Sequence, residues 1–158
     1  MIHLHSKIFV TVLSLFFCAI LLNPHFNYAQ NKSIVMTNPL LQKSKLQYQA
    51  PPFNLIKDEH FRPAFDYALK MHDAEIEKIA NNTAKPTFEN TALAIERSGE
   101  DYNRATGIFY NLTGSNTNPD LQKIEEDYAP IFSAHTDKLY LNEKLYKRLK
   151  AVDISLLK

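Results

Sequence analysis

The sequence predicts an all-α fold, and three observations lead to this class. Apolar residues recur at intervals of three and four over three long segments, which is the periodicity of one helix face. The chain has only 3 glycines and no tryptophan, which argues against a turn-rich all-β protein. With 158 residues, 45% hydrophobic and 22% charged, it has the composition of an ordinary globular protein and the length of a single domain.

The first predicted helix covers Asp58–Ala80. Asp58 is expected to cap its N-terminus, where a side-chain oxygen accepts a hydrogen bond from a free backbone N–H. Pro63 lies close enough to the first turn to be tolerated. The apolar and partly apolar positions that share one face are Phe61, Phe65, Ala68, Leu69, His72, Ile76 and Ile79.

The second predicted helical segment covers Thr87–Leu112, with Thr87 as its N-cap. Ser98 and Gly99 interrupt its apolar pattern. The sequence therefore predicts either one long kinked helix or two abutting helices. The polar run Thr113–Thr117 that follows is predicted as a loop.

The third predicted helix, Pro119–Leu139, has the clearest start. Asn118 is an expected N-cap, and Pro119 occupies the first helical position, where its missing N–H costs nothing. Pro130 is expected to bend this helix. A short helix is predicted over Glu143–Val152.

Residues 1–29 are expected to be a secretory signal peptide. Lys7 precedes the apolar run Ile8–Leu22, and Asn23-Pro24 ends it. The run is shorter than the roughly 20 residues that a membrane-spanning helix needs. Cleavage is expected after Ala29, and a retained anchor is the alternative. The protein is thus expected to be exported to the bacterial periplasm or secreted, with no membrane attachment after cleavage.

Residues 30–57 are predicted as a linker or extended arm, and residues 58–158 as a helical domain. Cys18 is the only cysteine and lies in the signal segment, so the mature protein is expected to have no disulfide. The formal net charge of +1 provides no field that would attract nucleic acid.

The residues alone indicate no catalytic, cofactor-binding or metal-binding site. Beyond the signal segment the histidines are His60, His72 and His135, and none has a second histidine four residues away, as the helix of a zinc protease requires. All three are expected to be surface or partly buried residues. The acidic run Glu125–Asp127 is expected to face solvent, because consecutive residues of a helix point in different directions.

Three stretches, in this order, carry a family resemblance: YQAPPFNLIKDEHFRPAF from Tyr48, IEKIANNTAKPTFENTALAIERSG from Ile76 and FYNLTGSNTNPDLQ from Phe109. Together they resemble the N-terminal region of the peptidyl-dipeptidases (dipeptidyl carboxypeptidases). These enzymes belong to the thimet oligopeptidase and oligopeptidase A group of zinc metallopeptidases.

The resemblance implies a mostly helical, two-lobed peptidase whose first helices help build one lobe. In that family zinc is held by a His-Glu-x-x-His helix and a further Glu, and short peptides enter a channel between the lobes. The motif does not occur in this sequence. The resemblance therefore implies an N-terminal portion that shapes the substrate channel, truncated before the catalytic domain and dependent on the missing C-terminal portion for activity.

The expected export and the residues of the three stretches favour the branch of the family that removes C-terminal dipeptides from short peptides. A fragment of an oligopeptidase A-like endopeptidase is one alternative. A non-catalytic helical binding module derived from the peptidase lobe is another.

Without the rest of such an enzyme, the helices are expected to expose apolar side chains and to self-associate or to be marginally stable. A closed, compact bundle is the alternative. The residues concerned are Phe61, Phe65, Phe109, Ile131 and Phe132.

The signal-peptide assignment makes a first prediction. The exported protein should begin at Gln30, and intact-mass spectrometry with N-terminal sequencing checks this. Replacing Ala29 with Leu should block processing, because the cleavage site requires a small residue. A mature protein that still begins at Met1 would contradict the assignment.

Overall fold

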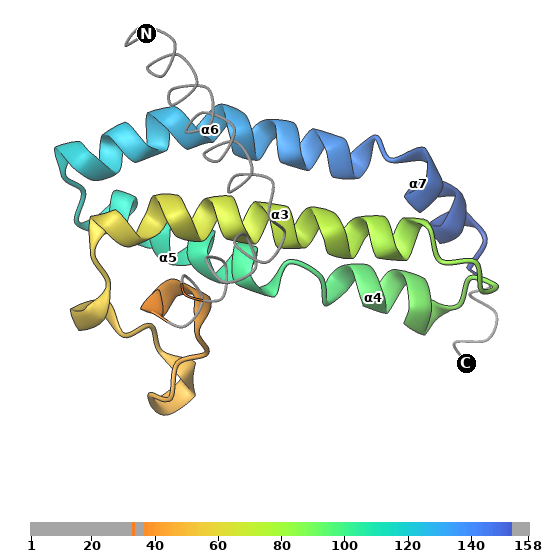
Figure 1. The fold of residues 1–158 in the computed structure, drawn as a ribbon, viewed down its shortest axis with the longest axis horizontal. Helices are drawn as coiled ribbons and strands as arrows, with labels where there is room; N and C mark the ends of the chain where they lie inside the picture. Colours follow the sequence, from red (N-terminus) through yellow and green to blue (C-terminus); the bar gives the residue numbers. More distant parts are fainter. Residues whose placement is uncertain (1–32, 34–36, 153–158) are drawn as a thin grey trace, which may run out of the picture. The chain divides into compact units, whose positions relative to one another are not determined.

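Helix α3, Phe61–Ala80, is the element against which the other helices pack. Figure 1 shows it between α6 and the α4–α5 pair. The helices in contact with it are α4 (Leu93–Glu96), α5 (Glu100–Ser115), α6 (Pro119–Tyr140) and α7 (Glu143–Lys150).

The computed structural model describes residue 33 and residues 37–152, and no strand occurs among them. The predicted all-α class is therefore confirmed. Within the same residues, no helix has the length and apolar character needed to cross a bilayer. The predicted signal peptide, residues 1–29, lies outside the described residues.

The start of the first helix differs from the prediction. Residues Asp58–His60 form a 3-10 turn (η4), and the regular helix α3 begins only at Phe61. Pro63 explains the delay, because its ring would clash with the carbonyl of Glu59 in a regular helix. Asp58 is not the N-cap; its carboxylate instead accepts a 2.8 Å hydrogen bond from the side chain of Asn118.

The second predicted segment is two abutting helical pieces. Thr87 caps the first as predicted, and a π-helical turn, Phe88–Ala92 (η5), leads into α4. The break falls at Gly99, whose φ of 69° is left-handed, and α5 follows at once. Glycine suits this position because it lacks the Cβ that makes positive φ costly.

The loop predicted over Thr113–Thr117 is wrong in its first half, because α5 continues to Ser115. Hydroxyl groups compete with helix formation when they bond to nearby backbone in other conformations. Here they bond back along the helix instead: the Ser115 hydroxyl donates to the Asn111 carbonyl at 2.6 Å.

The third and fourth helices match their predicted starts. The Asn118 side chain accepts from the Leu121 N–H at 2.8 Å, and α6 continues through Pro130. Asn142 caps α7 by accepting from the Leu145 N–H at 3.0 Å. Helix α7 ends at Lys150, two residues before the predicted Val152.

Phe65 lies at the centre of the core, with its ring in contact with four other aromatic rings. The ring centroids of Phe109 and Phe132 lie 5.2 and 4.9 Å away, both nearly perpendicular to it. Those of Phe61 and Tyr128 lie at 5.8 and 5.0 Å. Because these residues belong to α3, α5 and α6, a single cluster fixes three helices together.

Of the five residues expected to form an exposed apolar face, four are buried. Phe61, Phe65 and Phe109 have no exposed surface, and Phe132 is 6% exposed. Ile131 is 45% exposed. The described helices thus bury these rings among themselves, which favours the closed bundle over the sticky face.

A second, smaller apolar cluster joins α7 to the end of α3. Ile76 and Ala80 from α3 pack with Leu145 from α7, and partly buried residues complete the cluster: Ile79, Ile95 and Leu139. The short C-terminal helix is therefore held to α3 by apolar packing as well as by its connection to α6.

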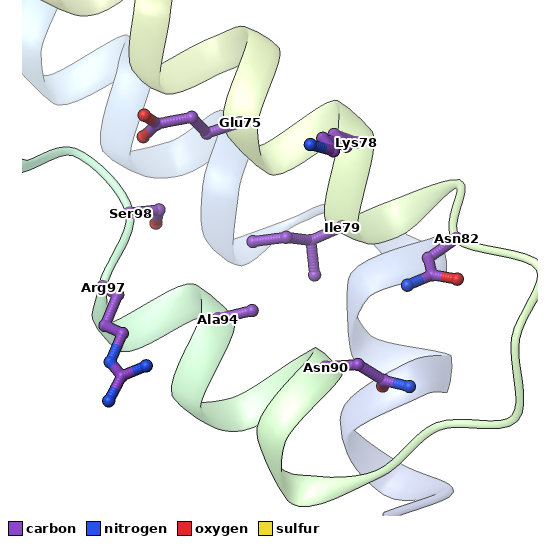
Figure 2. A pocket seen from close by; sticks show the side chains of 8 residues that line it. All are labelled: Glu75, Lys78, Ile79, Asn82, Asn90, Ala94, Arg97 and Ser98. Carbon is purple, nitrogen blue, oxygen red and sulfur yellow. The ribbon is translucent and has the colours of Figure 1, made fainter.

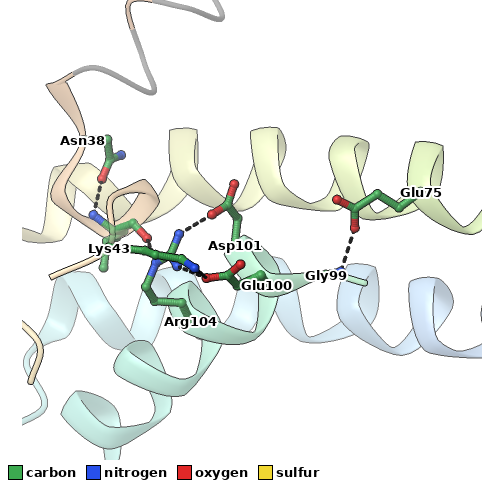
Figure 3. Close-up of polar contacts among 8 residues, drawn as sticks. Asn38, Lys43, Glu75, Gly99, Glu100, Asp101 and Arg104 are labelled. Atoms are coloured by element: carbon green, nitrogen blue, oxygen red, sulfur yellow. Dashed lines mark hydrogen bonds and ion pairs between the residues drawn. The ribbon is translucent and has the colours of Figure 1, made fainter. Parts of the chain in front are cut away.

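Part of the predicted linker is anchored to the helices. Leu40 is fully buried, and its carbonyl accepts a 3.0 Å hydrogen bond from the Arg104 side chain on α5. The Asn38 amide donates to the His60 carbonyl at 2.8 Å. Figure 3 shows Arg104 also reaching Glu100 and Asp101. These contacts attach the short 3-10 turn η1, Pro39–Leu41, to α3 and α5.

The ring cluster generates a second prediction. Replacing Phe65 with Ala should lower the free energy of unfolding by about 3–5 kcal/mol, because it removes a fully buried ring and leaves a cavity. Urea unfolding followed by circular dichroism measures the change. Tyr140→Ala, at a residue 78% exposed, is the matched control and should change stability by about 0.5 kcal/mol or less. Equal effects of the two changes would contradict the central role of Phe65.

Candidate functional site

A groove of about 300 Å³ lies between the C-terminal half of α3 and the segment formed by η5 and α4. Figure 2 shows Ile79 and Ala94 directed toward the space between the two segments. Lys78 and Arg97 carry positive charge at its edge, and neither joins an ion pair within the described residues. Its other lining residues are Glu75, Asn82, Asn90 and Ser98.

One wall of the groove is fixed by a reciprocal cap at the start of η5. The Thr87 hydroxyl accepts from the Asn90 N–H at 3.2 Å, and the Asn90 side-chain oxygen accepts from the Thr87 N–H at 2.9 Å. The Asn90 amide also donates to the Lys85 carbonyl at 2.9 Å. The stretch Pro-Thr-Phe-Glu-Asn-Thr, part of the family resemblance, therefore has a structural role as a helix start.

Arg148 on α7 is a buried cation held by uncharged groups. It is 8% exposed and donates to the carbonyls of Asn82 and Ala84, the latter at 3.1 Å. It also donates to the Asn90 side-chain oxygen at 3.0 Å and the Thr91 hydroxyl at 3.2 Å. Within the described residues it pairs with no carboxylate. Two of its acceptor residues line the groove, so Arg148 connects α7 to the groove wall.

A chain of five polar side chains joins α3, α6 and the turn between α4 and α5. The Ser98 hydroxyl lies 3.2 Å from Nε2 of His72, and Nδ1 of His72 lies 3.0 Å from Nε2 of His135. Nδ1 of His135 then lies 3.2 Å from Oδ1 of Asp73. Lys138 donates to the other oxygen of Asp73 at 2.8 Å.

The surroundings of His72 are closely packed. The ring is 9% exposed, and a Cβ at Gly99 would lie 2.9 Å from it. Burial lowers the pKa of His72, the neighbouring His135 lowers it further, and Glu75 and Asp73 act in the opposite direction. Glu75 itself accepts a 2.7 Å hydrogen bond from the Gly99 N–H.

The sequence did not predict that His72 and His135 would meet, because they lie on separate helices and 63 residues apart. A signal was nevertheless present, since each histidine occupies a position in the apolar stripe of its helix. His60 is placed elsewhere, where its Nδ1 accepts from the Lys57 N–H at 3.0 Å.

Zinc does not fit the residues that the structure brings together. A protein zinc site needs three or four ligands directed at one point. The nearest nitrogens of His72 and His135 instead share a hydrogen bond, so they point at each other. Across residues 37–152, no group of three His, Cys, Asp or Glu side chains is placed to hold a metal ion.

The acidic run on α6 has a structural role at one of its residues. Asp127 accepts a 2.6 Å hydrogen bond from Arg62 on α3 and lies 3.2 Å from Lys123. These two hydrogen bonds, the one from Arg62 first, lower the pKa of the Asp127 carboxyl. Asp127 thus links α6 to α3, beyond the solvent-facing role expected for it.

Comparison with known proteins identifies the class to which these helices belong. No protein-family profile matches the chain. Over 116 residues it is 46% identical to the dipeptidyl carboxypeptidase of Salmonella typhimurium, and over 115 residues 42% identical to that of Escherichia coli. It is 30% identical over 111 residues to the oligopeptidase A of Salmonella typhimurium.

These alignments cover 73%, 73% and 70% of this chain. The chain spans 17%, 17% and 16% of the length of the respective relatives. It belongs to the dipeptidyl carboxypeptidase and oligopeptidase A family of peptidases and corresponds to an N-terminal portion of it. The resemblance drawn from the three sequence stretches is thereby confirmed.

The Arg148 contacts generate a third prediction. Arg148→Met should lower the free energy of unfolding by about 1–3 kcal/mol, because buried acceptors lose their donor. Arg97→Met, at an exposed arginine of the same groove, should change it by about 0.5 kcal/mol or less. Urea unfolding of both variants makes the comparison. A variant at position 148 as stable as the parent would show that water or neighbouring groups replace the arginine.

Proposed function

We propose that this chain is the non-catalytic N-terminal portion of a zinc-dependent peptidyl-dipeptidase, which removes dipeptides from the C-termini of short peptides. The observation that carries the proposal is the 46% identity over 116 residues to a dipeptidyl carboxypeptidase. The lower identity of 30% to an oligopeptidase A favours the first branch over the second.

In this proposal zinc and the catalytic groups come from a C-terminal portion of the family enzyme. The described residues supply no set of ligands that zinc would occupy. The contribution of this chain is a rigid helical wall, whose rigidity comes from the ring cluster around Phe65 and the Arg148 contacts.

We further propose that the groove between α3 and α4 forms part of the surface that short peptides contact. Ile79 and Ala94 offer apolar contact for peptide side chains, and Lys78 and Arg97 offer positive charge to a peptide carboxylate. A groove of about 300 Å³ has the size of a small-molecule site. The export of the protein to the periplasm or medium is part of the same proposal and rests on the pattern of residues 1–29.

A helical binding module is the second candidate function. The observation that favours it is that the described helices bury their own aromatic core, with Phe61, Phe65 and Phe109 fully inaccessible. A module of this kind would bind short peptides with no other part of the enzyme present.

A chimera tests the main proposal. Residues 38–152 replace the aligned segment of the Salmonella typhimurium dipeptidyl carboxypeptidase. The chimera should release C-terminal dipeptides from blocked short peptides in a chelator-sensitive reaction, while the 158-residue chain alone should release none. A folded but inactive chimera, or chelator-sensitive activity of the chain alone, would contradict the proposal. Tight peptide binding by the chain alone would favour the binding module.

The groove has its own test within the chimera. Ala94→Trp should fill the groove and raise KM for short peptides with little change in kcat, the signature of lost binding that the ground state and transition state share. Tyr140→Trp, at an exposed position that does not line the groove, is the matched control. If both variants keep the parent KM, the groove is not a peptide-contacting surface.

A further inference from the structure

The hydrogen bonds that join Ser98, His72 and His135 indicate where their protons lie. The Ser98 hydroxyl has one proton and donates it to the Ile95 carbonyl at 2.6 Å. Toward His72 the hydroxyl therefore acts as an acceptor, so the proton between them belongs to Nε2 of His72. A neutral imidazole carries one N–H, which leaves Nδ1 of His72 as an acceptor.

The proton between His72 and His135 belongs to His135. Since Nδ1 of His72 accepts, Nε2 of His135 donates to it across 3.0 Å. Nδ1 of His135 faces Oδ1 of Asp73 at 3.2 Å, and an ionised carboxylate only accepts. Lys138 donates to the other oxygen of Asp73 at 2.8 Å. His135 thus presents an N–H to His72 on one side and faces the Asp73 carboxylate on the other.

We infer that these side chains form a proton-sensitive latch between α3, α6 and the α4–α5 turn. The latch is closed when His72 is neutral and accepts from His135, and it opens when His72 takes up a further proton. In the closed state each of the hydrogen bonds that join Ile95, Ser98, His72 and His135 has one donor and one acceptor.

A further proton on His72 has no acceptor. It would place an N–H of His72 against an N–H of His135 across 3.0 Å, on two rings whose centroids lie 4.9 Å apart. The lowered pKa of His72, caused first by burial and then by His135, agrees with this geometry.

The charged groups around His72 and His135 do not offer an acceptor for a further proton on His72. From α3, Asp73 is already paired with His135 and Lys138, and Glu75 is bound to the Gly99 N–H. From α5, the Tyr102 ring lies tilted against both histidine rings with centroid distances of 5.7 and 5.0 Å, and burial raises the pKa of its hydroxyl. The nearby α5 carboxylates pair elsewhere: Glu100 with Lys43 and Arg104, and Asp101 with Arg104.

The sign of the pH effect follows from linkage. In the unfolded chain His72 takes up a proton near its ordinary pKa of 6.5, whereas in the folded chain its pKa is lower. Between these two values the unfolded state binds one more proton. Stability is therefore full above about pH 6.5 and falls as the pH decreases below it, with the unfolding constant rising by up to about tenfold per pH unit.

Nitrogen NMR of the ring resonances of the full chain tests the proton placement directly. At neutral pH the spectrum should show His72 protonated at Nε2 only and His135 protonated at Nε2. A His135 that carries no proton on Nε2, or a His72 that carries a proton on Nδ1 at neutral pH, would overturn the latch. This measurement needs no variant.

Unfolding measured from pH 7 to pH 5 tests the consequence. His72→Asn places a non-titrating amide oxygen where Nδ1 of His72 accepted. It should therefore remove the rise of the unfolding constant with falling pH, which is up to about tenfold per pH unit in the parent. His60→Asn is the matched control and should keep the parent slope, since His60 lies outside the chain of bonds. Identical slopes for the parent and His72→Asn would overturn the latch.

The latch does not depend on the peptidase proposal. Ser98 and Glu75 line the groove, so opening the latch would also change the groove wall. An effect of this change on peptide binding would rest on the proposed function.

Discussion

Burial of the Phe65 ring is the interaction on which the other contacts depend. Four aromatic rings surround it, and they come from α3, α5 and α6. Perpendicular ring pairs are favoured over face-to-face stacking, so the cluster sets the rotation of each helix as well as its distance. His72 and His135 contact each other one or two turns further along α3 and α6, so the polar chain continues the same helix interfaces.

Local signals in the sequence predicted the helices well and their contacts poorly. The caps predicted at Thr87 and Asn118 depend on side chains within three residues, so they are visible in one sequence. The all-α class and the break at Gly99 follow from periodicity and from glycine. The continuation of α5 to Ser115 was missed because the hydroxyl contact depends on a helix already being present.

The candidate site was not predictable for a different reason. The groove and the His72–His135 contact join residues from elements that are distant in sequence, and no local pattern states which face meets which. The buried Arg148 shows the same limit: in the sequence it is one of several basic residues of α7, and only the fold places it against Asn82 and Asn90. The family resemblance indicated the class of protein, which local patterns do not show. It assigns no role to the residues that make these contacts.

The left-handed backbone at Gly99 separates helix α4 from helix α5. Within one continuous helix, the face that a residue occupies is determined by every residue before it. The left-handed conformation at Gly99 ends that dependence, so the orientation of α4 is not transmitted to α5. Ala94 can line the groove while Phe109 points into the core, with no common register between them. Insertions or deletions in the η5–α4 segment would thus reshape the groove and leave the ring cluster in place.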